Sequence, residues 1–397
     1  MSKFKVNEEE FLKALEKASM SAKDSYIITI SDRDYKGKKL ANITASDGIS
    51  QAMVTMIVEA DEPFRVIVGE ELFTIVRTLA LLKKEIVFEL DGNNISIKAG
   101  TSTVQLAVKE EAMSMDVSNI RNEENVIEIQ MNSEDFISGI RGAVYPSISF
   151  ETTREILQDT VCLMPCDCGT NNSLRLISSN GSVAAGTDVE VQTCNDNFNK
   201  NKQEKNYLTV SAVTLNKVAS RLETTKPTTI FMIPKQLFIT NGNDFYIIRP
   251  YEKAFPMGIA GMLYNENREY HIKLSARDLK VALDIAVLDS NEKVNKRAIV
   301  NLSKNGKVKI SSIYKKNNTS LSAIESDGEI TIALRTDYVK KIVDVISCDD
   351  VIISGTSNVE PIYITSEKNS SLISLVMPIN LDTVNKKVKD NKEKEQE

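Results

Sequence analysis

The sequence has no tryptophan and a single histidine, His271. One imidazole excludes a metal site built from several histidines and disfavours catalysis that uses histidine as the base. The surrounding pattern, YHIKLSARD, places His271 at the start of a strand just before a helix. We therefore interpret His271 as an ordinary strand residue.

Cysteine is also scarce, with five residues: Cys162, Cys166, Cys168, Cys194 and Cys348. The run CLMPCDC does not have a standard zinc spacing, and no histidine lies near it. In a strand, Cys162, Cys166 and Cys168 would share one face. We interpret them as reduced structural thiols, and we expect neither a metal nor a cofactor.

Long apolar runs are missing. No stretch of about 18 apolar residues occurs, so no membrane-spanning helix is predicted. The N-terminal MSKFKVNEEEF lacks the apolar core of a signal peptide, and we expect a cytoplasmic location. Hydrophobic residues make up 42% and charged residues 26%, as in ordinary globular proteins. The length of 397 residues favours two or three domains.

Catalytic signatures are missing too. The sequence contains no GxxxxGK[ST] loop, no GxGxxG after a strand, no HExxH, GxSxG or SxxK constellation, and no paired-carboxylate site on one element. This favours a protein that binds or organises partners over an enzyme. A nuclease that uses scattered carboxylates is the least favoured alternative.

What the sequence does contain is a repeated alternation of helices and strands. Apolar residues at intervals of three and four predict amphipathic helices that begin near Asn7, Gly69, Asn132, Ser211, Ser275 and Arg335. Asn7, Asn132 and Ser275 are plausible caps followed by acidic residues. Between the helices lie alternating or apolar runs: YIITIS, KLANITAS, QAMVTMIVEA, EIVFEL, NISIKA and TVQLAV.

Asx-Gly pairs interrupt the predicted strands. Because glycine and asparagine tolerate positive φ, such pairs predict tight hairpins. They are Asp47-Gly48, Asp91-Gly92, Asn180-Gly181, Asn241-Gly242, Asn305-Gly306 and Asp327-Gly328.

The order of elements recurs with a period of about 130 residues, which is too long for a solenoid repeat and indicates a repeated domain. ITASDG (43–48) and LISSNG (176–181) are a local echo of this repeat. We predict an α+β fold of three similar domains, each with two helices on antiparallel sheets. Their predicted ranges are 1–125, 126–262 and 263–381, followed by a disordered charged tail at 382–397.

Basic residues recur on every predicted helix, although the net charge is −6. On one helix they would indicate only a solvated face. Their recurrence favours contact with phosphates without reading of sequence. The candidates are Lys13, Lys17, Arg77, Arg141, Lys217, Arg221, Arg277, Lys280 and Lys340.

With these features the sequence resembles the bacterial β sliding clamps, the processivity subunits of DNA polymerase III. The resemblance runs from FLKALEKAS to LVMPIN. It rests on four motifs in order: LISSNGSVAAG (176–186), FPMG (255–258), LDSNEK (288–293) and LVMPIN (375–380).

The resemblance implies a homodimeric ring without enzymatic activity. Six domains would place their helices around duplex DNA, with Arg154 as a further DNA-facing cation. A clamp loader would load the ring, which would tether the replicative DNA polymerase for processive synthesis. The implied ring interface sets Val104 and Leu106, on an edge strand, against Val287 and Leu288.

The resemblance also implies a groove into which polymerase and loader insert short peptides. Its residues carry over as Leu157, Ser179, Gly181, Val183, Pro256, Ile259, Leu375, Met377, Pro378 and Ile379. The last predicted strand, SSLISLVMPIN, would then both close a sheet and form a wall of this groove.

Several positions depart from the family pattern. The usual His-Arg-Leu after the groove glycine is Ser182-Val183-Ala184, and the terminal arginine is Asn380. The groove is therefore less polar, and its peptide preference is open. These changes motivate an alternative function, that of a clamp-like adaptor that has lost polymerase binding.

Overall fold

The computed structural model describes residues 2–35, 37–115, 125–152, 154–288, 296–303, 305–313 and 317–381. The predicted tail and the part of LDSNEK beyond Leu288 lie outside these residues. The chain divides into two compact units. Unit 1 comprises residues 1–137 and 190–252, and unit 2 comprises 138–189 and 253–397. The three predicted domain ranges stay predictions.

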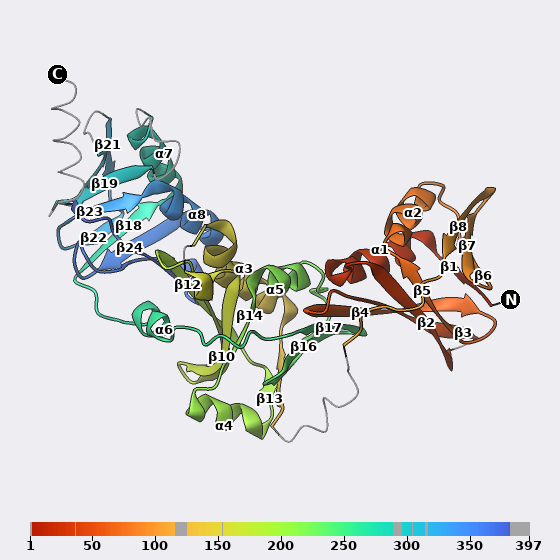
Figure 1. Cartoon of the computed structure of the whole chain (residues 1–397). Helices are drawn as coiled ribbons and strands as arrows, with labels where there is room; N and C mark the ends of the chain where they lie inside the picture. The colour runs from red at the N-terminus through yellow and green to blue at the C-terminus, as the bar shows by residue number, and fades with distance from the viewer. Residues whose placement is uncertain are drawn as a thin grey trace. The chain divides into compact units, whose positions relative to one another are not determined.

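Unit 1 is built on one large antiparallel sheet (Figure 1). Its strands are β1 (Lys3–Val6), β2 (Ser25–Tyr35), β3 (Lys38–Ser46), β4 (Ser50–Ala60), β5 (Phe64–Gly69), β6 (Ile86–Asp91), β7 (Asn94–Ala99), β8 (Ser102–Ala107), β9 (Ile127–Met131), β13 (Thr193–Cys194), β15 (Thr228–Ile233), β16 (Gln236–Asn241) and β17 (Asp244–Ile248). Their order is β13-β9-β15-β16-β17-β4-β1-β6-β7-β8, and β2, β3 and β5 branch from β4 through β3. A short strand, β14 (Leu208–Ser211), leads into a helix.

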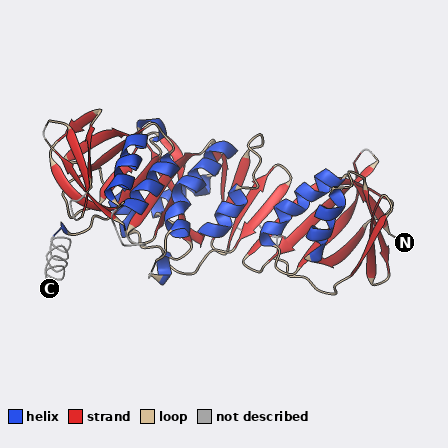
Figure 2. Ribbon diagram, turned by 90° about the horizontal axis from the view of Figure 1, so that it is seen from above, coloured by secondary structure: helices blue, strands red, loops and turns tan. Residues whose placement is uncertain are grey.

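The helices of unit 1 are α1 (Glu8–Ala18), α2 (Glu71–Ala80), α4 (Asp196–Glu204) and α5 (Ala212–Ala219). α1 and α2 lie side by side on the strands next to the N-terminus (Figure 2). Beneath them the rings of Phe4 and Phe88 stack with centroids 4.4 Å apart, and Phe11 of α1 packs against both. Burial of this aromatic cluster fixes the helices on the sheet.

Unit 2 contains two sheets. The larger has the order β10-β11-β12-β26-β25-β24-β18-β22, and the smaller has the order β21-β20-β19-β23. The strands are β10 (Thr160–Cys168), β11 (Asn171–Ser179), β12 (Val183–Glu190), β18 (Tyr270–Ser275), β19 (Arg297–Leu302), β20 (Lys307–Ser312), β21 (Asn318–Ser322), β22 (Glu325–Asp327), β23 (Ile330–Arg335), β24 (Asp350–Gly355), β25 (Ile362–Thr365) and β26 (Leu372–Val376). Its helices are α6 (Gly258–Leu263), α7 (Ala276–Ala286) and α8 (Thr336–Ile346), and α3 (Ser133–Ser149) runs across residue 138.

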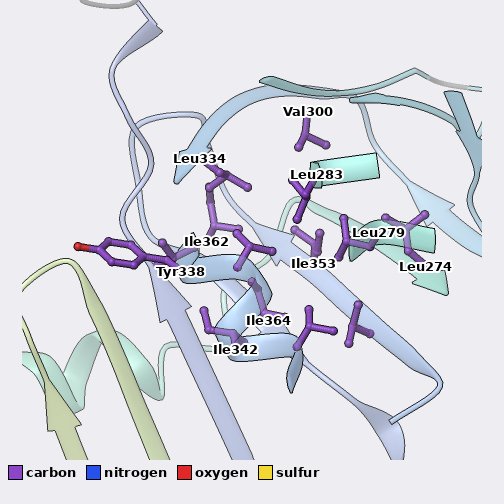
Figure 3. Close-up of a cluster of buried hydrophobic side chains, with 14 of the residues drawn as sticks. Leu274, Leu279, Leu283, Val300, Leu334, Tyr338, Ile342, Ile353, Ile362 and Ile364 are labelled. Carbon is purple, nitrogen blue, oxygen red and sulfur yellow. The ribbon is translucent and has the colours of Figure 1, made fainter. Parts of the chain in front are cut away.

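The main core of unit 2 is aliphatic (Figure 3). Side chains of α7 and α8, among them Leu279, Leu283 and Ile342, meet strand residues such as Ile353 and Ile364. The apolar stripe of each helix therefore faces the sheets, as the three- and four-residue spacing predicts.

Local signals place several helix starts where the sequence predicts them. Asn7 Oδ1 accepts from the amides of Glu9 and Glu10 at 3.1 and 3.0 Å. Ser211 and Ser275 Oγ cap α5 and α7 in the same way. His271 lies in β18, directly before α7, which confirms its interpretation as a strand residue. α4 and α6 were not predicted.

Five of the six Asx-Gly pairs form the predicted hairpins, and all six glycines have positive φ. The prediction for Asp327-Gly328 is wrong. β22 pairs with β18 in the larger sheet, whereas β23 pairs with β19 in the smaller one, so this turn moves the chain between sheets. The turn chemistry is local, but the choice of strand partner is not.

Candidate functional site

The candidate groove lies in unit 2 and begins at the β11–β12 hairpin. Asn180 Oδ1 accepts from the amides of Ser182 and Val183 at 2.9 and 2.8 Å, and Asn180 N donates to the Val183 carbonyl. Gly181 has a φ of +91°, which a residue with a side chain adopts at a cost. Ser179 Oγ accepts from Gly181 N at 2.9 Å and closes the turn.

A short 3-10 turn (Glu155–Leu157) brings Leu157 to this hairpin. A Cβ on Gly181 would lie 3.7 Å from Leu157 Cδ1 and 3.4 Å from Arg154 Cδ. The Ser147 hydroxyl lies within hydrogen-bonding distance of the carbonyls of Leu157 and Thr160, at 3.1 and 2.8 Å. These contacts hold Leu157 fully buried beneath the hairpin.

The end of β26 runs along the same hairpin. Ala184 pairs with Leu375, and Met377 N donates to the Ser182 carbonyl at 2.8 Å. Two residues later the chain crosses to the smaller sheet, where Ile379 N donates to the Ala333 carbonyl and its side chain packs beside Ile299. The last strand thus joins both sheets of unit 2.

α6 contributes the remaining candidates. Ile259 N donates to the Pro256 carbonyl at 2.9 Å at the start of the helix, and α6 packs beside β26. Phe255, which precedes α6 in the sequence, is also buried.

The predicted groove residues divide by exposure. Leu157, Ser179, Val183, Ile259 and Leu375 are buried, so they support the site from below. Met377 is 37% exposed, and Gly181, Pro256, Pro378 and Ile379 are half-buried. An apolar ligand could therefore touch mainly this second set.

Ile156, beside Leu157 on the same turn, is 38% exposed and was not among the predicted groove residues. The positions that depart from the family pattern also differ in exposure. Val183 and Ala184 are buried, Ser182 is half-buried, and Asn380 is exposed.

Several predicted DNA-facing cations of unit 1 are paired within the protein. Lys13 bonds Glu9 on the same helix at 2.9 Å. Lys17 bonds Glu223 at 2.6 Å and Asp244 at 2.5 Å. Burial lowers the pKa of Lys17, but the bonds to Asp244 and Glu223 outweigh it, so the pKa rises above its ordinary value. Lys17 therefore stays protonated, and its ammonium group remains bonded to Asp244 and Glu223.

In unit 2, two ion pairs join α7 and α8. Lys280 bonds Asp344 at 2.8 Å, and Lys340 bonds Asp284 at 2.5 Å. The remaining candidates form no ion pair with another residue that the structure describes: Arg77, Arg141, Arg154, Lys217, Arg221 and Arg277. Arg221 is half-buried, and the other five are exposed.

The predicted interface residues lie on separate elements. Val104 and Leu106 are half-buried on β8, the last strand of its ladder, as predicted for an edge strand. Val287, directly after α7, is 7% exposed, whereas Leu288 is 76% exposed.

The five cysteines form no disulfide, and Cys162 and Cys166 are buried. Burial raises the pKa of Cys162 and of Cys166 to about 12. Across the described ranges, no group of three or more His, Cys, Asp or Glu side chains is arranged to hold a metal ion. In the same residues, no helix is long and apolar enough to cross a membrane.

Solved structures match the chain over nearly its whole length. The DNA polymerase sliding clamp of Bacillus subtilis is 16% identical, with a TM-score of 0.79 over 96% of this chain and 99% of that one. The DNA polymerase III β subunits of Pseudomonas aeruginosa and Thermotoga maritima are 16% and 15% identical, with TM-scores of 0.80 and 0.77. Each of these two alignments covers 96% of this chain and 100% of the other.

One Pseudomonas aeruginosa clamp was solved bound to griselimycin. No protein-family model matches the chain, and no curated protein matches it in sequence. At these identities the comparison shows the fold, which is that of the DNA polymerase III β sliding clamps.

Proposed function

We propose that this chain is a DNA sliding clamp that encircles duplex DNA and tethers the replicative DNA polymerase after a clamp loader has placed it. The observation that carries the proposal is the match to sliding clamps over 96% of the chain, with TM-scores of 0.77 to 0.80. The absence of catalytic motifs from the sequence agrees with a tether that performs no reaction. The comparisons do not favour the alternative of an adaptor without polymerase binding.

In the proposed assembly, two cytoplasmic chains of three domains each close a ring head to tail. β8 of one chain, with Val104 and Leu106, meets Val287 and Leu288 of the other. Unpaired backbone groups on an edge strand can continue a sheet across such an interface. The helices that carry Arg77, Arg141, Lys217 and Arg277 would line the hole, with Arg154, which precedes the 3-10 turn, as a further cation. A ring holds DNA by topology, so these contacts can be weak and exchange quickly.

The proposed peptide groove is the one formed by the β11–β12 hairpin, the end of β26 and α6. Half-buried apolar walls with a few fixed polar groups are typical of ligand sites. Met377 suits this role, because its flexible thioether adapts to different apolar partners. We propose that griselimycin also binds this chain at the groove, and it then serves as a probe.

The experiment that tests the ring combines negative-stain electron microscopy with light scattering on the purified full chain. We expect particles with the mass of two chains and six lobes around a hole wide enough for duplex DNA. A compact or crescent-shaped monomer at every concentration would overturn the ring.

A further inference from the structure

Two stacked arginine–tyrosine pairs are connected to the C-terminal end of α6. In the first, the guanidinium carbon of Arg175, in β11, lies 3.4 Å from the ring centroid of Tyr264, directly after α6. In the second, the guanidinium carbon of Arg268 lies 3.3 Å from the ring centroid of Tyr363, in β25. Cation–π contacts of this kind are strongest where water is excluded.

The Arg175 side is a buried hydrogen-bonded cluster. Arg175 Nε and Nη2 donate to the two oxygens of Asp188 at 2.6 and 2.7 Å, and the Asp188 side chain is 6% exposed. The Tyr264 hydroxyl donates to Asp188 Oδ1 at 3.1 Å. Burial, and then the Asp188 charge, raise the pKa of Tyr264 well above its usual value, so this hydroxyl remains a donor. Such bidentate, charge-assisted bonds have a fixed geometry.

Gly186, in β12, makes room for the tyrosine. A Cβ at this position would lie 2.7 Å from Tyr264 Oη and 3.3 Å from its nearest ring carbons. Glycine here is thus required by the close approach of the ring and not by a turn.

The second pair bonds the helix backbone through Tyr363. Tyr363 Oη donates to the carbonyl of Met262, in the last turn of α6, at 2.6 Å. The end of α6 is therefore bonded to β11 and β12 through Tyr264 and to β25 through Met262. A helix of six residues is not stable alone, so these contacts determine where it lies.

We propose that Arg175, Asp188, Gly186 and Tyr264 are positioning residues that hold α6, and with it Pro256 and Ile259, as one wall of the groove. A buried ion pair contributes little net stability compared with apolar packing, but it specifies geometry. The functional part of the proposal rests on the proposed peptide groove. The placement of α6 by this cluster does not depend on any ligand.

The test introduces and then relieves one clash. Gly186→Ala should push the Tyr264 ring out of its stack on Arg175 and speed hydrogen–deuterium exchange in residues 255–266 by about tenfold, the effect of losing a buried cation–π contact. Adding Tyr264→Phe to this variant removes the atom nearest the new Cβ, at 2.7 Å, and should slow exchange again, because the ring carbons at 3.3 Å need to shift only by a few tenths of an ångström. If the substitutions only destabilised the protein, exchange would be faster still in the double variant, because that variant has also lost the Tyr264 hydroxyl and its bond to Asp188.

Gly261→Ala is the matched control. It adds the same atom inside α6 with no atom within 4 Å, so exchange should not quicken. Tyr264→Leu, which removes stack and hydroxyl together, should reproduce the effect of Gly186→Ala if that variant folds poorly. Unchanged exchange in both Gly186→Ala and Tyr264→Leu would overturn the proposal.

Griselimycin affinity separates the two proposals. We expect it to fall about tenfold in Gly186→Ala and to recover with Tyr264→Phe. If the exchange results hold but wild-type protein binds no griselimycin, the proposed ligand of the groove is wrong and the positioning cluster stands. If griselimycin binds equally to all variants, the cluster does not position the groove wall.

Discussion

Lys17 in α1 and Asp244 at the start of β17 form an ion pair with an Nζ–Oδ2 distance of 2.5 Å, and the Asp244 side chain is 6% exposed. Lys17 also bonds Glu223, which in turn bonds Lys226. The pair joins the N-terminal helix to a strand far along the chain within unit 1. Removing Lys17 would leave the Asp244 carboxylate buried without its cation.

We therefore predict that Lys17→Met destabilises the protein by about 2 kcal/mol, the cost of an unpaired buried charge. Urea unfolding measures the change. Lys13→Met is the matched control, because Lys13 is one turn away and its bond to Glu9 is exposed, so we expect a much smaller change in the free energy of unfolding. An equal loss of unfolding free energy in the two variants would show that the buried ion pair stabilises the protein no more than an exposed one does.

The same cluster predicts a dependence on acid. The bonds to Lys17, and then to Lys226, lower the pKa of Glu223 from its usual 4.5. A lowered carboxyl pKa contributes stability above the unfolded value, and this contribution is lost as pH falls through the folded value. The difference in unfolding midpoint between wild type and Glu223→Gln should be constant from neutral pH to about pH 5.5 and shrink below about 4.5. A difference that grows on acidification would contradict this.

Met377 provides a direct test of the groove. Met377→Ala should weaken griselimycin binding about five- to tenfold, as for a contact residue at a binding site. Met113→Ala is the control, because Met113 is an exposed methionine in unit 1. Isothermal titration calorimetry measures both variants. An unchanged affinity in Met377→Ala would place the compound elsewhere.

The ring interface makes a separate prediction. Val104→Lys puts a charge on the edge strand β8, and charges on edge strands oppose pairing. We expect the mass from light scattering to fall to that of one chain. Val359→Lys, at an apolar residue that is 63% exposed in unit 2, should leave the mass unchanged. A dimer that survives Val104→Lys would exclude β8 as the contact.

Thiol reactivity should separate the cysteines of β10. Because burial raises the pKa of Cys162 and Cys166 to about 12, both remain protonated and unreactive at pH 8. Cys168 is exposed at the end of the same strand. Mass spectrometry after brief alkylation should find Cys168 modified and the other two intact until urea is added. Rapid modification of Cys162 would contradict its burial.

Local chemistry explains what could be predicted from the sequence. The caps at Asn7 and Ser275 and the positive φ of the turn glycines depend on neighbours within a few residues. α4 escaped prediction because it is polar and buries only Phe198, and α6 because six residues show no periodicity. α3 begins near the predicted Asn132 but continues to Ser149 with Pro146 inside it, against the usual rule for proline.

Long-range contacts could not be predicted. Nothing in the sequence near Lys17 indicates Asp244, and nothing near Tyr264 indicates Arg175 or Gly186. The groove residues came from the resemblance, and the structure adds which of them are exposed. Their roles as a binding site, like those of the basic helices, remain proposals.

The pairing of β12 with β26 has a consequence for synthesis of the chain. β12 ends at Glu190, but the strand that covers its free edge is residues 372–376. Until those residues leave the ribosome, one edge of β12 has unpaired backbone groups, and its mostly buried side chains lack part of their packing; such surfaces aggregate. Such high contact order also makes folding slow. We therefore expect nascent chains that stop before β26 to need chaperones, and destabilising changes in β26 to lower the yield of soluble protein more than equal changes in β1.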